Sequence, residues 1–376
     1  MKKILALAMC ALMAVMCMAS CGGNTAVNYA AENTEYFIGA TGPLTGDASS
    51  YGISVQEGAS LAVEEINAAG GLNGVMFKFD IKDDKAAAAD AASGYDILYE
   101  AGMQISLGSV TSGSCASFGE KAAADNVFFI TPSASAANVI EVGDNAFRVC
   151  FGDPDQGILA AQQLTTDYET IGCIYDTSDP YSTGIWEAFD AEMKNIGVEY
   201  NKQTFDAENK KDFTTQVEAL KDCDVIFLPI YYTEAGLIAK AAAAKGCDAV
   251  IFGCDGLDGV AGQIDDTVKN VIKYITPFDV ASTEEPAASF VKNYEAKYGK
   301  KPDQFAADGY DAIYAIFAAM QKAGVNDVTI APSDLCELVK TAITAEDFSL
   351  AGTTGVMTWD ASGACTKEPV IVDLSK

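Results

Sequence analysis

The sequence predicts an α/β protein made of two lobes, each built on a doubly wound parallel sheet. Three observations support this class. Apolar strand-like runs alternate with helix-periodic segments along most of the chain. Repeated strand–helix–strand units require crossovers, which make neighbouring strands parallel and cover both faces of a sheet. The 376 residues exceed what one hydrophobic core usually organises, so two domains are expected.

The periodicity places the elements in order along the chain. An apolar strand at residues 36–40 precedes a helix in which Val55, Ala59 and Ile66 recur at helical spacing. The Gly70-Gly71 pair ends this helix. The same unit then recurs, with further strands predicted at residues 77–81, 105–107, 127–130, 171–175, 225–228 and 249–252.

The first residues are typical of an export signal. Lys2 and Lys3 precede an apolar run at residues 4–18, which leads into Ala19-Ser20-Cys21. A cysteine directly after small residues predicts lipoprotein processing, with residues 1–20 as signal peptide and Cys21 as the lipidated residue; ordinary secretory cleavage is the alternative. Residues 21–34 are small and polar, as in a flexible tether. The protein is therefore expected outside the cytoplasmic membrane, anchored to it by lipid on Cys21.

Composition excludes several classes of function. The net charge of −29 repels nucleic acid and anionic lipid head groups, so no nucleic-acid partner is expected. The chain contains no histidine, which removes Ser-His-Asp and Cys-His catalysis and HExxH zinc sites. A hydrolase using the paired acids Asp265-Asp266 or Glu284-Glu285 is a weaker alternative, because adjacent acids are usually solvated charge. We expect no enzyme activity, no cofactor and no metal.

The cysteines are expected to be mostly small buried hydrophobes. Eleven are present, and eight remain once Cys10, Cys17 and Cys21 are set aside. Cys223 and Cys247 stand at the entrances of two consecutive predicted strands. If those strands are parallel neighbours, the two sulfurs could meet, so a disulfide between them stays open.

Small hydroxyl residues follow two consecutive strands of the first predicted sheet. Residues 109–114 precede a predicted helix from Cys115, and residues 131–135 precede another from Ala136. Unpaired N–H groups at a helix start favour an anion, so two such ends side by side would hold a carboxylate without arginine. The alternative is that these serines only cap their helices.

The second predicted sheet offers an acid and several rings. Asp255 follows the strand at 249–252 and could accept an ammonium group, or could simply be a turn residue. Tyr51, Tyr181 and Tyr231 lie in loops after strands. Because ligands of doubly wound sheets bind beyond the carboxyl ends of strands, these rings could form the walls of a cleft.

Taken together, these segments resemble the leucine/isoleucine/valine-binding proteins, which are type I extracytoplasmic solute-binding proteins of ABC importers. The resemblance covers essentially the whole chain after the tether. The segments that carry it are 38–46, Tyr51-Gly52, 59–67, 69–74, Asp83-Asp84, 108–114, 130–136, 355–360 and Gly363.

The resemblance implies a ligand site. Ser112 matches the serine that binds the amino-acid carboxylate, and Ser133, Ala134 and Ser135 match the segment that holds carboxylate and ammonium. The three tyrosines named above match cleft aromatics. Asp255 stands where the family places a glutamate for the ammonium. The shorter acid, and an insertion near residues 179–180, leave the side-chain pocket open.

The resemblance also implies a type I periplasmic-binding-protein fold with a three-strand hinge. Lobe 1 is then expected to comprise residues 35–151 and 283–352, and lobe 2 residues 152–282 and 353–376. We expect a monomer that captures a small amino acid, branched-chain or otherwise apolar, by clamshell closure and delivers it to a membrane ABC permease. The alternatives are a receptor for amides, urea or aromatic acids, or a ligand-sensing module for a separate signalling receptor.

Overall fold

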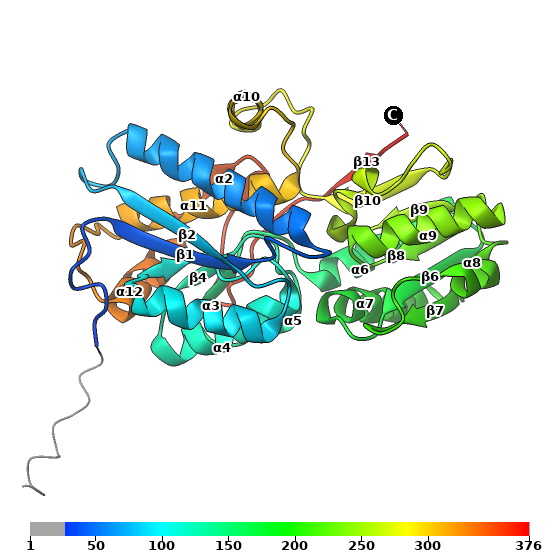
Figure 1. Ribbon diagram of the computed structural model, residues 1–376, viewed down its shortest axis with the longest axis horizontal. Coiled ribbons are helices and arrows are strands. Elements are labelled where there is room, and N and C mark those ends of the chain that lie inside the picture. Colours follow the sequence, from blue (N-terminus) through cyan, green and yellow to red (C-terminus); the bar gives the residue numbers. More distant parts are fainter. Residues whose placement is uncertain (1–26, 376) are drawn as a thin grey trace, which may run out of the picture.

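Two lobes lie side by side in the computed structural model, which describes residues 27–375 (Figure 1). Each lobe is a parallel sheet with helices on both faces, so the predicted fold class is confirmed. We call the lobe built on strands β1–β5 lobe 1 and the lobe built on strands β6–β10 lobe 2. No helix within residues 27–375 combines the length and apolarity that a bilayer crossing requires.

The two sheets share one strand order. Lobe 1 has the order β2-β1-β3-β4-β5, and lobe 2 has β7-β6-β8-β9-β10 with β13 added antiparallel at the β10 edge. The lobe 1 strands are β1 (Tyr36–Gly42), β2 (Phe77–Asp83), β3 (Ile105–Ser106), β4 (Phe129–Thr131) and β5 (Ala146–Arg148). Those of lobe 2 are β6 (Ile171–Asp176), β7 (Asn201–Phe205), β8 (Val225–Leu228), β9 (Val250–Gly253), β10 (Ile272–Thr276) and β13 (Val370–Asp373).

Helices cover both sheets. Lobe 1 carries α2 (Ser49–Ala68), α3 (Ala88–Glu100), α4 (Ser112–Asp125), α5 (Ala137–Ile140), α10 (Ala287–Tyr298), α11 (Gln304–Lys322) and α12 (Pro332–Ile343). Lobe 2 carries α6 (Asp153–Asp167), α7 (Pro180–Ile196), α8 (Thr214–Leu220) and α9 (Tyr232–Lys245), together with the short 3₁₀ helices η1 (Asp255–Leu257) and η2 (Val260–Gly262). A small hairpin, β11 (Leu350–Gly352) with β12 (Gly355–Met357), completes the fold.

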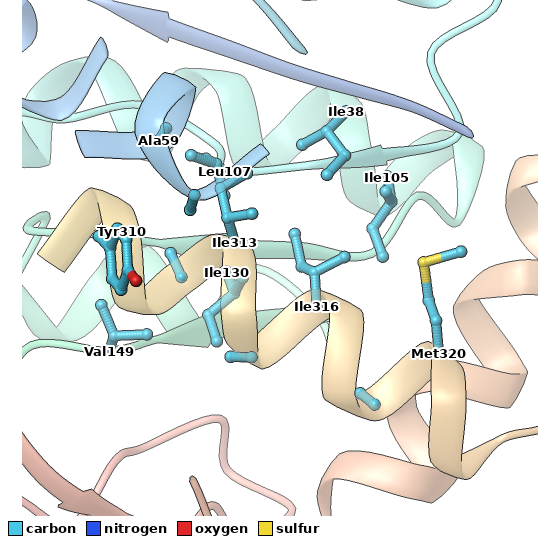
Figure 2. Packing of buried hydrophobic residues seen from close by; sticks show 14 of the residues in the cluster. Ile38, Ala59, Ile105, Leu107, Ile130, Val149, Tyr310, Ile313, Ile316 and Met320 are labelled. Atoms are coloured by element: carbon cyan, nitrogen blue, oxygen red, sulfur yellow. The ribbon is translucent and has the colours of Figure 1, made fainter. Parts of the chain in front are cut away.

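Helix α11 forms the centre of the lobe 1 core. Figure 2 shows Tyr310, Ile313, Ile316 and Met320 on one face of α11, pointing toward apolar side chains of the sheet. Residues three or four apart share a helix face, and each aliphatic side chain buried this way contributes about 1.5–3 kcal/mol. On its other side α11 meets α2 so closely that a Cβ at Gly58 would stand 1.9 Å from the backbone oxygen of Ala306. Only glycine fits there.

The strands of lobe 2 bury side chains on both faces. Ile226 and Leu228 of β8 pack in the core cluster under α8 and α9, whereas Val225 and Phe227 pack in the cluster under α6 and α7. Side chains alternate in this way because a strand has a period of two. A parallel sheet covered on both sides therefore gives continuous apolar runs, which is why the sequence revealed these strands.

The chain passes between the lobes three times, and the third passage differs from the prediction. The first lies between β5 and α6, and the second lies between Thr276 of β10 and Phe278, which packs in the lobe 1 core. Met357 and Trp359 are also buried in the lobe 1 core, and Trp359 Nε1 donates to the backbone oxygen of Arg148 at 2.7 Å. Residues 353–359 therefore pack with lobe 1 and not with lobe 2.

The predicted boundary was wrong because a run of small residues was interpreted as a hinge. Thr353 and Thr354 form the turn of the β11–β12 hairpin, and their backbone N–H groups donate to the buried carboxylate of Asp311 on α11. Lys367 Nζ then pairs with Asp308 of α11 at 3.0 Å, with both side chains buried. The chain joins the lobe 2 sheet only at β13. A run of small residues thus marked a tight turn and not a hinge.

The N-terminal region also differs in part from the prediction. The predicted signal peptide and Cys21 lie outside the described residues. Within the predicted tether, Asn28 Nδ2 donates to the Thr329 oxygen at 3.0 Å, Ala30 is fully buried, and Asn33 Nδ2 donates to the Gly102 oxygen at 2.9 Å. The segment from Asn28 to Asn33 is therefore docked on lobe 1.

The cysteines of the described residues are free thiols. Seven of the eight are buried and Cys365 is half-buried. Strands β8 and β9 are parallel neighbours, as the disulfide hypothesis required, but Cys223 and Cys247 are not bonded to each other.

Candidate functional site

The candidate site lies where the two sheets present the carboxyl ends of their strands to each other. In each sheet the strand order reverses at one point, between β1 and β3 in lobe 1 and between β6 and β8 in lobe 2. Chains leaving opposite sides of such a point diverge and leave a crevice. The segments that follow β1, β3, β4, β6, β8 and β9 are the ones in which the sequence placed its candidate residues.

A small cavity lies between the lobes at this point. It is lined by Tyr51, Val110, Thr111, Ser112, Ser133 and Phe305 of lobe 1, and by Tyr181, Tyr231, Asp255 and Gly256 of lobe 2. Six of the eight predicted ligand residues are thus brought together. Ala134 and Ser135 do not line the cavity, and the side chain of Ala134 is buried in the lobe 1 core. Sequence reasoning missed Phe305, which no local motif marks.

The lobe 1 wall offers neutral donors at the start of α4. Ser112 is the first residue of this helix, and its hydroxyl accepts from the backbone N–H of Ala136 at 3.2 Å. No side chain caps α4, so its first N–H groups are available to an anion. The Ser133 hydroxyl donates to the Val110 oxygen at 2.8 Å. The second predicted helix is the single turn α5, so the carboxylate-binding capacity of this wall rests on α4 and the serine loop.

The lobe 2 wall is built around Asp255. Its carboxylate accepts from the Tyr181 hydroxyl at 2.7 Å, and that hydroxyl accepts from the Gly256 N–H at 2.8 Å. The Asp255 N–H donates to Gln156 Oε1 at 3.0 Å, which fixes the backbone. Burial raises the pKa of Asp255 to about 6, while the hydrogen bond from Tyr181 opposes the rise. This carboxylate can accept an ammonium group from the cavity.

Aromatic rings close the cavity and join the lobes. The Tyr51 hydroxyl, from lobe 1, donates to the Gly256 oxygen and accepts from the Tyr232 N–H at 3.0 Å. The rings of Tyr181 and Tyr231 stack at 5.0 Å, and the ring of Tyr51 lies 4.1 Å from that of Phe305. Direct hydrogen bonds between the lobes show that the structure is the closed form of the cleft.

A wider cavity of about 330 Å³ shares Tyr181 and Tyr231 with the first. At its rim Lys210 of lobe 2 lies 3.6 Å from the Asp47 carboxylate of lobe 1 and 3.2 Å from that of Glu234. This rim is charged, whereas the inner cavity holds mostly aromatic and hydroxyl groups. The wider cavity therefore has charged groups in its lining next to the smaller one.

Unpartnered polar atoms gather around the inner cavity. Among the described residues, ten buried side-chain polar atoms lack a hydrogen-bond partner of ordinary geometry. Seven of these atoms belong to segments that border the cavity, namely to Thr111, Ser114, Ser135, Asp153, Gln156 and Tyr231. Each such group costs about 1–3 kcal/mol, so proteins rarely concentrate them without a use. Of these residues, Thr111 and Tyr231 line the cavity, so a polar ligand there would lie within reach of their hydroxyls.

Comparison with known proteins places the chain in a family. A model of the periplasmic binding protein family matches residues 35–355. A Leu/Ile/Val-binding protein of Rhizobium johnstonii is 28% identical over 302 residues, which cover 76% of this chain and 79% of that protein. These matches span both lobes and the hinge.

Solved structures show the same architecture. A branched-chain amino acid transporter substrate-binding protein of Streptococcus pneumoniae, solved in complex with isoleucine, has a TM-score of 0.77 and 28% identity, covering 90% of this chain and all of that one. A solute-binding protein of R. palustris in complex with benzoate has a TM-score of 0.80 at 20% identity, covering 90% of this chain and 95% of that one, which shows a shared fold alone. With the family model matching most of its length, this chain belongs to the periplasmic binding protein family, whose members are extracytoplasmic solute-binding proteins and not enzymes.

Proposed function

We propose that this protein captures a small apolar α-amino acid, such as a branched-chain one, in the interlobe cavity and presents it to an ABC permease in the membrane. One observation carries the proposal. Neutral donors of lobe 1 and the carboxylate of Asp255 in lobe 2 line the same cavity between the lobes. A zwitterion has complementary ends for these two walls.

The contacts suggest how each end is held. The ligand carboxylate would rest at the first turn of α4 beside Ser112 and Ser133, where backbone N–H groups and the helix dipole favour negative charge. The ammonium would point at Asp255. Each charge-assisted hydrogen bond of this kind contributes about 1.5–3 kcal/mol. The isoleucine in the Streptococcus pneumoniae complex and the name of the Rhizobium johnstonii relative support an amino acid of this type.

Closure follows from the same contacts. A ligand that touches both walls binds the closed form better than the open form and shifts the population toward it by that difference in affinity. The interlobe hydrogen bonds of Tyr51 are available only when the lobes meet. The closed surface would then dock on the permease.

A thermal-shift screen tests the ligand class. The purified protein is heated with each amino acid, with the matching des-amino acids, and with benzoate, urea and simple amides. We expect stabilisation by apolar amino acids, because a ligand at 100 times its dissociation constant adds about 2.7 kcal/mol. The des-amino acids should have a much smaller effect. A response to benzoate or amides, without any amino-acid response, would support the aromatic-acid or amide alternative and contradict this proposal.

Lipid anchoring is a separate part of the proposal. The basic, apolar and small-residue order of residues 1–21 supports a diacylglyceryl group on Cys21. Growth with a clickable fatty acid should label the wild-type protein and leave Cys21→Ala unlabelled. Equal labelling of the two proteins would contradict this part alone.

A further inference from the structure

The first turns of two helices, one from each lobe, meet across the cleft. Helix α2 of lobe 1 begins at Ser49, and helix α9 of lobe 2 begins at Tyr232. The residues at their N-cap positions, Ala48 and Tyr231, make no side-chain hydrogen bond to the first N–H groups. A helix start leaves several N–H groups without intrahelical partners, so both helices need acceptors from elsewhere.

Each helix receives an acceptor from the opposite lobe. The Tyr232 N–H of α9 donates to the Tyr51 hydroxyl of α2 at 3.0 Å, and the Ser50 N–H of α2 donates to the Tyr232 hydroxyl at 3.2 Å. The exchange is reciprocal, since a tyrosine of each helix caps the start of the other. Helix starts carry partial positive charge and repel each other. The two phenol oxygens between them make this approach favourable.

Three further polar contacts between the lobes surround this exchange. The Thr233 hydroxyl donates to the Asp47 backbone oxygen at 2.8 Å, and the Tyr51 hydroxyl donates to the Gly256 oxygen. The ion pair of Lys210 with Asp47 adds a charged contact at the rim. We call the contacts between the first turns of α2 and α9 the interlobe clasp, which is formed by residues 47–51 and 232–233.

The two tyrosines of the interlobe clasp are buried against each other. Tyr51 is 2% exposed and Tyr232 is 4% exposed, and their rings meet edge to face with centroids 4.8 Å apart. Ala48 of lobe 1 and Leu257 of lobe 2 belong to the same core cluster as both rings. Hydrogen bonds that are shielded from water are stronger than exposed ones. Opening the cleft would separate the rings and hydrate the bonds, so the clasp favours the closed form.

Tyr51 connects the interlobe clasp to the ligand cavity, whereas Tyr232 stands apart from it. Tyr51 is part of the cavity lining. The linings of the inner and the wider cavity both leave out Tyr232, although its neighbour Tyr231 belongs to both. The hydroxyl of Tyr232 can therefore influence a bound ligand only through closure of the lobes.

We propose that the interlobe clasp holds the cleft closed through contacts within the protein itself, and that Tyr232 is a positioning residue that slows ligand release. The role in release rests on the proposed function, whereas the effect on closure requires no ligand. An enclosed ligand leaves only when the lobes part, so removing a clasp contact raises its dissociation rate. Association needs the open cleft and should not become slower. Because Tyr232 acts through closure, different ligands should be affected by the same factor.

Stopped-flow measurement of ligand release tests the inference. Isoleucine and valine are the first probes, replaced by the two amino acids that stabilise the protein most in the thermal-shift screen if these two do not bind. Tyr232→Phe removes only the hydroxyl that accepts from the Ser50 N–H. It should raise the dissociation rate of both amino acids about three- to tenfold, which corresponds to the loss of one hydrogen bond.

A second variant and a matched control accompany this test. Thr233→Val keeps the shape of the side chain but removes the hydroxyl that donates to Asp47, so it also should speed release, and it remains informative if Tyr232→Phe folds poorly. Tyr298→Phe is the control, because its hydroxyl donates to the Glu57 oxygen at 2.8 Å within lobe 1. The control should release both amino acids at the wild-type rate. Urea denaturation compares the stability of all three variants with that of the wild type.

A measurement without ligand separates this inference from the proposed function. Small-angle X-ray scattering compares the unliganded wild type with the double variant Tyr232→Phe/Thr233→Val, and we expect a larger radius of gyration in the variant because its closed population falls. If the wild type binds no amino acid, the proposed function fails, and this comparison alone decides whether the clasp acts.

Three results would overturn the inference. The first is an equal radius of gyration for the unliganded wild type and the double variant. The second is release from Tyr232→Phe and Thr233→Val that is no faster than release from Tyr298→Phe. The third is a different factor for the two amino acids, which would show that Tyr232 acts on the ligand directly and not through closure.

Discussion

Lobe 1 and lobe 2 have the same strand order but present opposite chemistry to the cavity between them. Lobe 1 contributes the start of α4 and the hydroxyls of Ser112 and Ser133, and none of its residues that line the cavity is a carboxylate. Lobe 2 contributes phenols and Asp255. The shared strand order thus places side chains at equivalent strand ends in the two lobes. The residues at these ends make the lobe 1 wall suitable for an anion and the lobe 2 wall suitable for a cation.

The lobes also differ in how they hold the third connecting segment. Lobe 1 fixes this segment through the Lys367–Asp308 ion pair and the Asp311 hydrogen bonds to the hairpin turn, whereas the segment joins the lobe 2 sheet at β13. Because Asp308 and Asp311 surround it, the ammonium of Lys367 has a raised pKa and stays charged despite its burial. The segment should therefore move with lobe 1 when the cleft opens.

The largest expected effect comes from breaking that attachment. Lys367→Ala leaves the buried carboxylate of Asp308 without its partner, which costs about 3–5 kcal/mol of the free energy of unfolding. Urea denaturation monitored by circular dichroism measures this loss. Lys322→Ala is the matched control, because the Lys322–Asp347 pair of lobe 1 lies on the surface and should matter by less than about 1 kcal/mol. Equal effects of the two variants would show that the third segment is not anchored to lobe 1.

Removing charge from the acidic wall should affect recognition of the amine. Asp255→Asn is expected to weaken amino-acid binding about ten- to a hundredfold, since it replaces a charge-assisted bond worth about 1.5–3 kcal/mol. Binding of the des-amino analogue should change little. Calorimetry on both ligands measures the split, with Asp265→Asn, an exposed acid of lobe 2, as control. An equal loss of affinity for both ligands would show that lobe 2 does not recognise the amine.

The smallest effect should come from the neutral wall. Ser112→Ala removes one hydroxyl but leaves the backbone N–H groups of α4 in place, so we expect a loss of about 0.5–1.5 kcal/mol, or up to about tenfold in affinity. The amino acid and its des-amino analogue should suffer equally, because both carry the carboxylate. Ser93→Ala, on the exposed face of α3, is the control. A loss of affinity for the amino acid alone would show that its ammonium binds lobe 1, which is the opposite of the proposed arrangement of the two walls.

Much of the fold and part of the site could be predicted from the sequence. Buried parallel strands are continuous apolar runs, so β1, β6, β8 and β9 stood out with nearly their observed bounds. Strand ends in such sheets carry ligand residues, which is why Ser112 and Asp255 could be picked as candidates before their contacts were known. Both inferences need only local periodicity and a general rule of topology.

The rest depended on contacts between distant segments. Phe305 lines the cavity because α11 returns to lobe 1 after the chain has passed through lobe 2. No sequence pattern marked Asp153, and only the folded structure shows that this first residue of α6 is fully buried. Nothing in the sequence indicated that Trp359 would be buried in the lobe 1 core, which places residues 353–359 with lobe 1.

By itself, then, the sequence determined the two α/β lobes, the alternation of their strands and helices, and the hydroxyl and acidic residues at the strand ends, because these follow from periodicity and from the side chains present. The tertiary structure alone decided which polar groups are left without partners, which lobe holds the third connecting segment, and how closely the two walls approach. Burial and pairing are properties of segments far apart in the chain, and they exist only once the lobes have folded and met.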